Sequence, residues 1–360
     1  MTLPTQMKAM VLTGHGGLEM YHWHEDWPVP QPATGEVLIR VRACGLNNTD
    51  VNTRSGWYSK AVSEATTGGA YDRVNDEDPT WGGAPITFPR IQGADVCGQI
   101  VAVGAGVDAA RVGERVITDN WLRDPDDPGN MYKTGYFGSE RDGGFAQYCT
   151  IPAQNALAVT SGYSDAELAT FSCSYSTAEG MLHRAAVGPD DTVLVPGASG
   201  GVGSALVQLA KLRGARVIAL ASEAKHADVA ELGPDRLLPR APEDLKGALA
   251  GETVTVLADV VGGGQWPALI DVLERGGRYT CSGAIAGPMV QMDLRTFYLR
   301  DLTFTGSTVI APEVTQNLVR YIEAGQIKPV LAASYPLSEL RAAQQAFIDK
   351  RHTGNIVVLP

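Results

Sequence analysis

Up to about residue 160, the chain alternates apolar and polar positions with a period of two in several short runs. The clearest run covers residues 36–43, where apolar side chains occupy every second position and arginines stand at 40 and 42. This period is typical of β-strands that bury one face. The predicted strands span residues 8–12, 36–43, 99–104, 115–117 and 145–151. Glycine turns separate them, so we expect an antiparallel, partly open β-barrel in this part of the chain.

From about Ser164 onward, runs with a helical period alternate with short β-branched runs. Strands are predicted at 193–196, 216–221, 236–238, 254–260, 278–281 and 302–306, and helices at 165–169, 176–186, 201–213, 224–232, 266–274 and 312–323. Such alternation favours a doubly wound parallel sheet with helices on both faces, an α/β fold. The tail from Tyr335 to Pro360 again reads as helix plus strand, and we expect it to rejoin the first part. The predicted domains are therefore 1–160, 161–324 and 325–360.

A glycine-rich turn joins the strand at 193–196 to the helix at 201–213. Glycine allows a tight turn and a close approach of the backbone to a pyrophosphate, which the N–H groups at a helix N-terminus can bind. A strand before the turn and a helix after it are the context that a dinucleotide-binding motif requires. The candidate cofactor-binding residues of this turn are Gly197, Ser199, Gly200, Gly201, Val202 and Gly203.

Composition and charge narrow the class of partner. The chain has 44% hydrophobic and 19% charged residues and a net charge of −11, which disfavours nucleic acid or an anionic membrane as the main partner. We see no secretory signal and no apolar run long enough to span a bilayer. The five cysteines are scattered and odd in number. Free thiols in a reducing cytoplasm fit this usage best.

The residues that follow the strand at 216–221 bear on which cofactor is bound. A carboxylate at this point would bond the ribose hydroxyls of NAD, but here the position is Ser222, and Lys225 lies three residues on as a counter-charge for a 2′-phosphate. NADP(H) is therefore favoured. Glu223 leaves an alternative, because a carboxylate swung inward would restore a preference for NAD, and Lys225 could also be a solvated helix residue.

Seven motifs together resemble the medium-chain dehydrogenase/reductase superfamily over essentially the whole chain. They are residues 45–50 (GLNNTD), 93–98 (GADVCG), 103–107 (VGAGV), 113–116 (GERV), 142–148 (DGGFAQY), 197–203 (GASGGVG) and 354–358 (GNIVV). The resemblance implies a GroES-like catalytic domain and a Rossmann dinucleotide-binding domain. It also implies a homodimer formed along an edge strand near residues 302–309.

The zinc-dependent alcohol dehydrogenases of that superfamily hold their metal with a Cys, a His and a second Cys, and a Glu lies nearby. Matched motif to motif, these positions are Asn47, Ala94, Cys173 and Asp95. Catalytic zinc needs three good protein ligands, so we expect none here. The family's structural zinc lobe would lie in 119–144, which has no cysteine. The chain thus resembles the zinc-free branch, which contains quinone oxidoreductases and enoyl-thioester reductases and which uses a similar Ser-x-x-Lys for NADPH.

Without a metal, hydrogen-bond donors must meet the charge that hydride transfer develops on a substrate. The first candidate donor is Tyr58, which matches a tyrosine of the enoyl reductases, although it could equally be a packing residue. Thr49 stands where the zinc enzymes keep a proton-relay hydroxyl, with a helix cap as the alternative. Asn47 fills the former ligand position and could bond the nicotinamide ribose or the substrate oxygen.

Further cofactor contacts are expected at the carboxyl edge of the parallel sheet, where open α/β sheets bind ligands. Thr177 stands where the family contacts the nicotinamide, and Val261 belongs to the wall on the adenosine side. Ser282, Gly283 and Ala284 follow a strand at the same edge.

These residues predict an NADPH-dependent reductase of activated alkenes, enones or quinones. The alternatives are a zinc-free carbonyl or alcohol oxidoreductase, a crotonyl-CoA reductase-like enzyme, and a non-catalytic NADPH-binding protein. The acidic residues of the long loop at 60–90 speak against a CoA substrate, which should want basic ones. That loop and the one at 119–144 exceed the usual loop length and are candidate substrate-binding loops.

Overall fold

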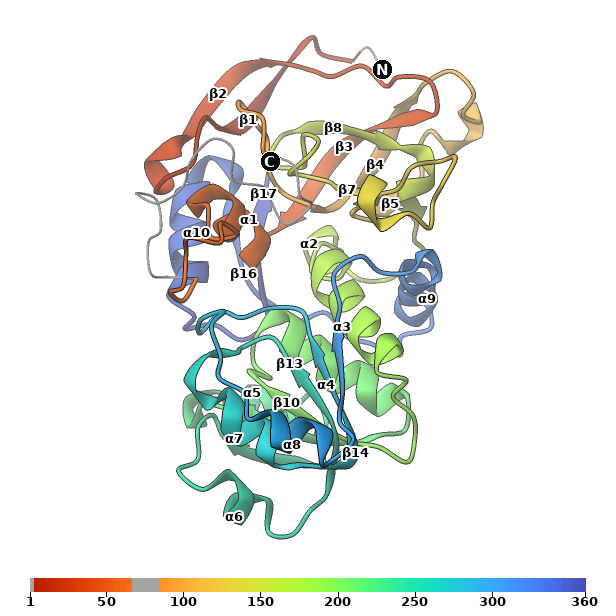
Figure 1. Ribbon diagram of the computed structural model, residues 1–360. Coiled ribbons are helices and arrows are strands. Elements are labelled where there is room, and N and C mark those ends of the chain that lie inside the picture. The colour runs from red at the N-terminus through yellow and green to blue at the C-terminus, as the bar shows by residue number, and fades with distance from the viewer. Residues whose placement is uncertain (1–2, 67–84) are drawn as a thin grey trace.

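The computed structural model describes residues 3–66 and 85–360. In Figure 1 a first unit lies above a second, and α10 (Leu340–Ile348) and β17 (Asn355–Leu359), late in the chain, lie beside the early elements of the first unit. The expected α/β class, with a GroES-like unit and a Rossmann-like parallel sheet, is confirmed. Most of the predicted loop at 60–90 lies outside the described residues. Within the described ranges, no helix is both long and apolar enough to cross a membrane.

The first unit contains a seven-stranded, mainly antiparallel sheet with the order β16-β17-β3-β4-β5-β9, in which β8 pairs with β3. Its strands are β3 (Glu36–Gly45), β4 (Asp95–Val103), β5 (Arg115–Thr118), β8 (Tyr148–Pro152), β9 (Ala156–Ala158), β16 (Leu331–Pro336) and β17. β17 runs antiparallel to β3, with Val358 opposite Cys44. Residues 331–359 therefore complete the sheet that residues 36–45 begin.

Two elements near the start of the chain are absent from the sequence-based expectations. β2 (Tyr21–Pro28) pairs with β1 (Gln6–Leu12), but its histidines and acidic residues hide any apolar alternation. α1 (Asn48–Ser55) has one aliphatic side chain, yet six of its eight residues are buried. A capping box between Asn47 and Asp50 starts this helix, and left-handed Gly56 (φ 70°) ends it. The helix is thus specified by its caps and its buried polar contacts.

The second unit is a parallel sheet with the order β12-β11-β10-β13-β14-β15. Its strands are β10 (Thr192–Pro196), β11 (Arg216–Ala221), β12 (Arg236–Pro239), β13 (Val254–Asp259), β14 (Leu273–Cys281) and β15 (Thr303–Gly306). The helices between and around them are α2 (Asp165–Leu168), α3 (Ser172–Arg184), α4 (Gly201–Leu212), α5 (His226–Ala230), α6 (Leu245–Leu249), α7 (Trp266–Asp271), α8 (Leu294–Tyr298) and α9 (Pro312–Glu323). The order reverses at β10, and ligands bind open α/β sheets at such a switch point.

Two short segments in the remaining loops are also ordered. β6 (Trp121–Leu122) and β7 (Gly135–Tyr136) form a small hairpin within the predicted loop at 119–144. Single 3-10 turns occur elsewhere, at Leu18–Met20, Ala109–Arg111, Met131–Lys133, Ala153–Asn155, Glu223–Lys225, Gly263–Gln265 and Leu337–Glu339. The turn at Glu223–Lys225 replaces the start of the helix expected at 224–232.

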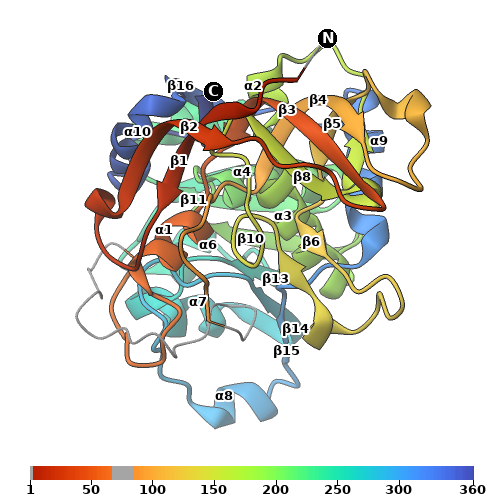
Figure 2. The ribbon, with the colours of Figure 1, turned by 90° about the horizontal axis from the view of Figure 1, so that it is seen from above.

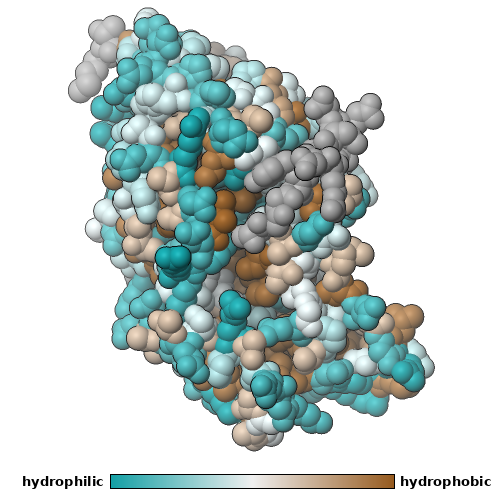
Figure 3. Space-filling model, turned by 90° about the vertical axis from the view of Figure 1, so that its left-hand side faces the viewer, coloured by the Kyte–Doolittle hydropathy of each residue, from teal (hydrophilic) through white to brown (hydrophobic). Residues whose placement is uncertain are grey.

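The two units share one apolar core. It combines Ala43, Cys97 and Ile117 of the first unit with buried side chains of α3, α4 and β10. A second cluster fills the first unit alone. Near the middle of the face in Figure 3, apolar side chains gather between the two units. The units are thus joined by buried apolar surface as well as by the chain itself.

At the other end of the second unit, β15 closes the six-stranded order. The preceding α8 projects from the body of the molecule in Figure 2, and Leu294, Tyr298 and Leu299 nearby are all more than half exposed. The homodimer expected along 302–309 would use this edge, and it stays a prediction.

Candidate active site

The glycine-rich turn has the strand–turn–helix geometry that the sequence predicts. Gly197 follows β10 with a φ of 68°, a conformation that favours glycine. A Cβ on Gly203 would lie 2.1 Å from the carbonyl oxygen of Gly197, and one on Gly201 would lie 2.4 Å from Asn355 Oδ1. Side chains at these positions would collide with the turn itself and with Asn355, so both glycines are needed for the turn to pack closely against the start of α4. The turn therefore leaves backbone N–H groups accessible to an anion.

Asn355, next to Gly201, is a candidate site residue that the sequence analysis did not name as one. It is 3% exposed, and its Oδ1 accepts a hydrogen bond of 2.9 Å from Ser174 Oγ. Its Nδ2 is buried and has no hydrogen-bond partner. An unsatisfied buried donor beside a glycine cradle is costly unless a ligand meets it. The residues at this turn thus fit the pyrophosphate of a dinucleotide cofactor.

Ser222 and Lys225 lie after β11, next to the glycine turn. The Lys225 ammonium donates to the carbonyl oxygens of Lys350 at 2.7 Å and of His352 at 2.5 Å. Burial lowers the pKa of Lys225, and nearby Asp228 opposes this shift. An ammonium has three donors, so one remains for a phosphate. Glu223 is exposed to solvent.

The other predicted cofactor residues gather at the carboxyl edge of the sheet. Val261 lies against Gly197, since a Cβ there would stand 2.9 Å from Val261 Cγ2. The Asp259 carboxylate accepts from the N–H of Val261 at 2.7 Å and so fixes the turn after β13. Ser282, Gly283 and Ala284 follow β14 and are partly exposed. Gly197, Val261 and residues 282–284 therefore share one edge.

A second group of predicted residues meets around the N-terminus of α1. Asn47 is 6% exposed and lies beside Asp95, where its amide helps to lower the pKa of that carboxyl, although Nδ2 has no well-formed hydrogen bond. Asp95 Oδ1 accepts from Cys173 N–H and from Asn120 Nδ2, each at 2.9 Å. Burial nevertheless dominates and raises the pKa of Asp95 to about 7.

Tyr58 and Thr49 are brought into contact in this group. The partly buried Tyr58 hydroxyl lies near Thr49 and Asn52, close enough for both side chains to act on its pKa. Burial raises the pKa of Tyr58, and these two polar neighbours oppose the rise. Cys173 lies near enough to act on the Tyr58 charge, and Thr177 in turn lies near the Cys173 thiol. The phenol, the threonine and the predicted nicotinamide contact therefore surround one space.

The loop at 119–144, which the sequence marks as a candidate substrate-binding loop, reaches this site through Asn120, a residue that the sequence did not single out. Asn120 Nδ2 bridges Asp95 and the Tyr136 hydroxyl, at 2.9 and 3.3 Å. The Tyr136 ring packs edge-on against Trp121, with centroids 5.1 Å apart. Through Asn120 the loop thus contacts Asp95 of the candidate site.

The donor set around Asp95 is poor for catalytic zinc. Of the four positions compared with the zinc enzymes, Asn47 and Ala94 supply no metal-binding charge, and Asp95 Oδ1 already accepts two hydrogen bonds. Burial, with Asp95 nearby, raises the pKa of the Cys173 thiol, which disfavours the thiolate that zinc prefers. Across 3–66 and 85–360, no group of three His, Cys, Asp or Glu side chains could hold a metal. These residues do not fit the family's catalytic zinc.

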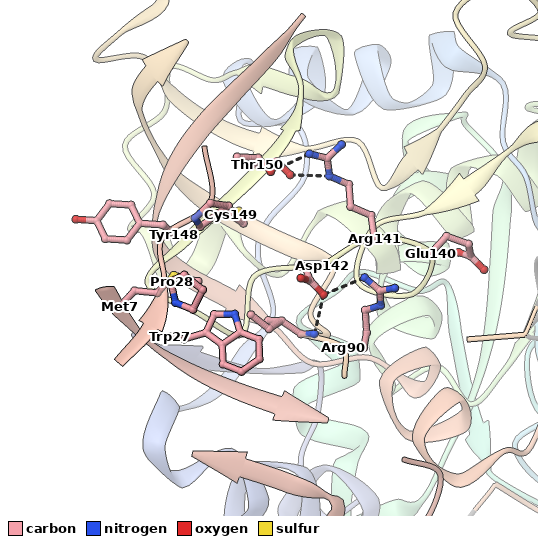
Figure 4. Close-up of a pocket in the computed structure, with 13 residues that line it drawn as sticks. Met7, Trp27, Pro28, Arg90, Glu140, Arg141, Asp142, Tyr148, Cys149 and Thr150 are labelled. Atoms are coloured by element: carbon pink, nitrogen blue, oxygen red, sulfur yellow. Dashed lines mark hydrogen bonds and ion pairs between the residues drawn. The ribbon is translucent and has the colours of Figure 1, made fainter. Parts of the chain in front are cut away.

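A separate pocket of about 340 Å³ lies on the first unit (Figure 4). Arg90 donates to Asp142 at 2.9 Å in its wall, and Arg141 Nε donates to the Thr150 carbonyl at 3.0 Å. None of the predicted site residues lines this pocket. We assign it no part in the chemistry below.

We compared the chain with protein families and with solved structures, and several matches cover most of its length. Residues 33–161 match the alcohol dehydrogenase GroES-like domain, and residues 201–324 match the zinc-binding dehydrogenase family. A solved putative alcohol dehydrogenase from Sinorhizobium meliloti 1021 is 46% identical, with a TM-score of 0.91 over 99% of this chain and 98% of that one. A thermostable alcohol dehydrogenase from Pyrobaculum aerophilum, solved with cobalt and zinc, is 30% identical, with a TM-score of 0.81 over 99% of this chain and all of that one.

Curated relatives match along the whole length as well. An acryloyl-coenzyme A reductase from Metallosphaera sedula is 27% identical over 98% of this chain and 99% of its own length. A quinone oxidoreductase from Homo sapiens is 25% identical over 98% of each. The fold, the glycine turn and these matches agree. The chain belongs to the medium-chain dehydrogenase/reductase superfamily of NAD(P)-dependent oxidoreductases.

Proposed function

We propose that this protein is a zinc-independent, NADPH-dependent reductase of activated alkenes, enones or quinones. The observation that carries the proposal is the partly buried Tyr58 phenol, which lies near Thr49 and Asn52 beside a donor set that does not fit zinc. Without a metal to polarise a carbonyl group, hydride transfer needs a substrate whose acceptor carbon is already electrophilic. A hydrogen-bond and proton donor is then enough to stabilise the charge that develops.

In this mechanism, bound NADPH would supply a hydride to the β-carbon of the substrate. The Tyr58 hydroxyl then donates its proton to the enolate that results, and the electron pair of the O–H bond stays on the phenolate oxygen. Thr49 hydrogen-bonds the phenolate and returns a proton to it from water. Asn47, at the edge of the same space, orients the substrate oxygen. With an enone the product is the saturated carbonyl compound, and with a quinone the same hydride and proton give the hydroquinone.

The relatives support activated alkenes and quinones as the substrate class, and they also point to carbonyl compounds or alcohols as a second candidate class. An acryloyl thioester is an activated alkene and a quinone is an activated acceptor, and reductases of both are similar to this chain over its whole length. A carbonyl or alcohol oxidoreductase is the second candidate, because the 46% identical solved structure is described as a putative alcohol dehydrogenase.

Oxidation of NADPH with a panel of enones, quinones, enoyl-CoA thioesters and aldehydes would test the proposal. We expect turnover with an enone or a quinone. Turnover confined to aldehydes would favour the second candidate. Tight NADPH binding without turnover on any acceptor would leave a cofactor-binding protein and overturn both enzyme assignments.

Metal analysis tests the zinc-independent part. Protein purified without chelator and dialysed after addition of zinc should retain no stoichiometric zinc, because only one thiol and one hydrogen-bonded carboxylate face the former ligand positions. Elemental analysis by plasma mass spectrometry measures this directly. One full equivalent of zinc per chain would place the protein with the zinc-dependent alcohol dehydrogenases instead.

Replacement of Lys225 by Met should raise the Kd for NADPH about tenfold or more and change that for NADH far less. A charge-assisted hydrogen bond to phosphate contributes about 1.5–3 kcal/mol, and only NADPH carries the 2′-phosphate. Titration of intrinsic fluorescence gives both constants. Exposed Lys246 on α6 provides the control variant Lys246→Met. Equal weakening of both cofactors would refute the proposed 2′-phosphate contact.

A further inference from the structure

The pocket on the first unit lies apart from both groups of candidate site residues (Figure 4). It is lined by the start of β1, the end of β2, the first part of β8 and the turn at 140–143. In Figure 1 these strands lie on the side of the first unit that faces away from the parallel sheet. A volume of about 340 Å³ is within the range of small-molecule sites. A ligand here would therefore leave the cofactor site free.

One set of residues around the pocket is apolar and partly aromatic. Met7, Ile91 and Cys149 line it and are each at most 3% exposed. The indole of Trp27 and the phenol ring of Tyr148 also line it and are half-buried. Aromatic side chains hold a planar ring of a ligand by offset stacking or by edge contacts. The apolar part of the pocket thus suits a flat ring.

Arg90 gives the pocket a charged donor that the protein does not use. Its side chain is 14% exposed, and its Nη1 donates to Asp142 Oδ1 at 2.9 Å. Nε is buried and has no hydrogen-bond partner, and within 3–66 and 85–360 no group accepts from Nη2 either. Nε–H and Nη2–H form the fork by which an arginine binds a carboxylate through two hydrogen bonds. A buried donor without a partner is costly unless a ligand meets it.

The neighbouring charged groups of the pocket wall already have partners. Arg141 Nη1 donates to Glu36 Oε1 at 2.6 Å, and its other two nitrogens donate to Thr150. Glu140 Oε2 accepts from the backbone N–H of Tyr136 at 2.8 Å. A single open guanidinium fork suits one carboxylate. A phosphate dianion would want a second open cation, which the described part of the wall does not offer.

We propose that this pocket binds a small molecule that combines a planar ring with one carboxylate. The carboxylate lies on Nε and Nη2 of Arg90, and the ring lies against Trp27 and Tyr148. The inference does not depend on the proposed reaction, because none of the candidate catalytic or cofactor-binding residues lines the pocket. It gives the first unit a ligand site of its own beside the shared active site.

Calorimetric titration of the full chain with 2-naphthoate tests this proposal without any variant. We expect one site per chain with a Kd of about 1 mM or tighter, a usual affinity for a ligand of this size. Neutral 2-naphthamide, which has the same ring, should bind tenfold or more weakly, because it lacks the charge-assisted hydrogen bonds. Saturating NADPH should leave the Kd for naphthoate unchanged. Equal binding of acid and amide, or displacement of naphthoate by NADPH, overturns the proposal.

Two variants locate the bound naphthoate. Arg90→Met should weaken naphthoate binding tenfold or more and change naphthamide binding less than threefold, because only the charged donor is lost. Trp27→Ala should weaken both ligands, because it removes a ring contact. Arg42, an exposed arginine on β3 outside the pocket, gives the matched control Arg42→Met, which should bind like the wild type. Naphthoate binding that is unchanged in Arg90→Met overturns the proposal.

Discussion

Tyr58→Phe should lower kcat by about 10²- to 10⁴-fold, the usual contribution of a positioned proton donor, and should leave the Kd for NADPH unchanged. The substitution removes one oxygen and keeps the ring, so the edge contact with Trp57, at a centroid distance of 5.8 Å, survives. The variant lacks the hydroxyl group and therefore cannot donate a proton to the enolate. Stopped-flow NADPH oxidation with the best acceptor of the panel separates kcat from binding.

The control for this prediction is Tyr132→Phe, because Tyr132 is 98% exposed and lies on the loop at 119–144. Burial raises the pKa of Tyr58, so the phenol stays protonated through neutral and mildly alkaline pH. The wild-type rate should therefore keep this donor through mildly alkaline pH, because the pKa of Tyr58 lies above the ordinary value for a tyrosine. Normal turnover in Tyr58→Phe would reduce Tyr58 to a packing residue.

Asp95→Asn should stabilise the fold, and by more at pH 8 than at pH 5. Burial raises the pKa of Asp95 from 3.8 to about 7, so between these values the folded chain holds a proton that the unfolded chain has lost. The stability that this group contributes is complete below pH 4, falls as the pH rises to 7, and stays low above that. A shift of about three pKa units corresponds to at most about 4 kcal/mol at pH 8.

Urea unfolding at pH 5 and pH 8 measures the effect. The asparagine keeps an oxygen for Cys173 N–H and Asn120, so the hydrogen bonds to Oδ1 are preserved. Exposed Asp126 provides the control, Asp126→Asn, which should change stability little at either pH. Burial raises the pKa of Asp50 to about 7 as well, so the wild type should itself lose stability over this range. An equal gain at both pH values would show that Asp95 is ionised in the folded chain without cost.

The fold was largely predictable because its main elements carry strong local patterns. The alternation at 36–43 predicts a strand, and the sequence at 193–213 predicts a strand, a glycine turn and a helix. The observed β3, β10 and α4 have nearly the same bounds as these predictions. α1 was not predictable in this way, because its stability comes from a capping box and from polar side chains buried by distant parts of the chain. Periodicity reports which face is apolar, and α1 has almost no apolar face.

Tyr58 and Thr49 are candidate site residues that lie close in sequence, and the structure places them near each other. Their roles stay predictions. Asn355 and Lys350 were out of reach, because they meet the glycine turn and Lys225 from more than a hundred residues away. The sequence predicts that the tail rejoins the first unit, but it does not show that β17 pairs with β3 and so carries residues 349–355 to the glycine turn. Contacts set by topology become visible only with the fold.

Because β17 pairs with β3, the first unit to be synthesised cannot complete its sheet until the end of the chain has been made. The Rossmann sheet is assembled from strands that are consecutive in the chain, so it can form while translation is still under way. The GroES-like sheet holds a vacant strand position until residues 355–359 have emerged and found their place beside Gly45 and Cys44. A nascent chain that stalls before them leaves the Cys44–Gly45 end of β3 without its partner strand, and an open strand edge is a surface that promotes aggregation.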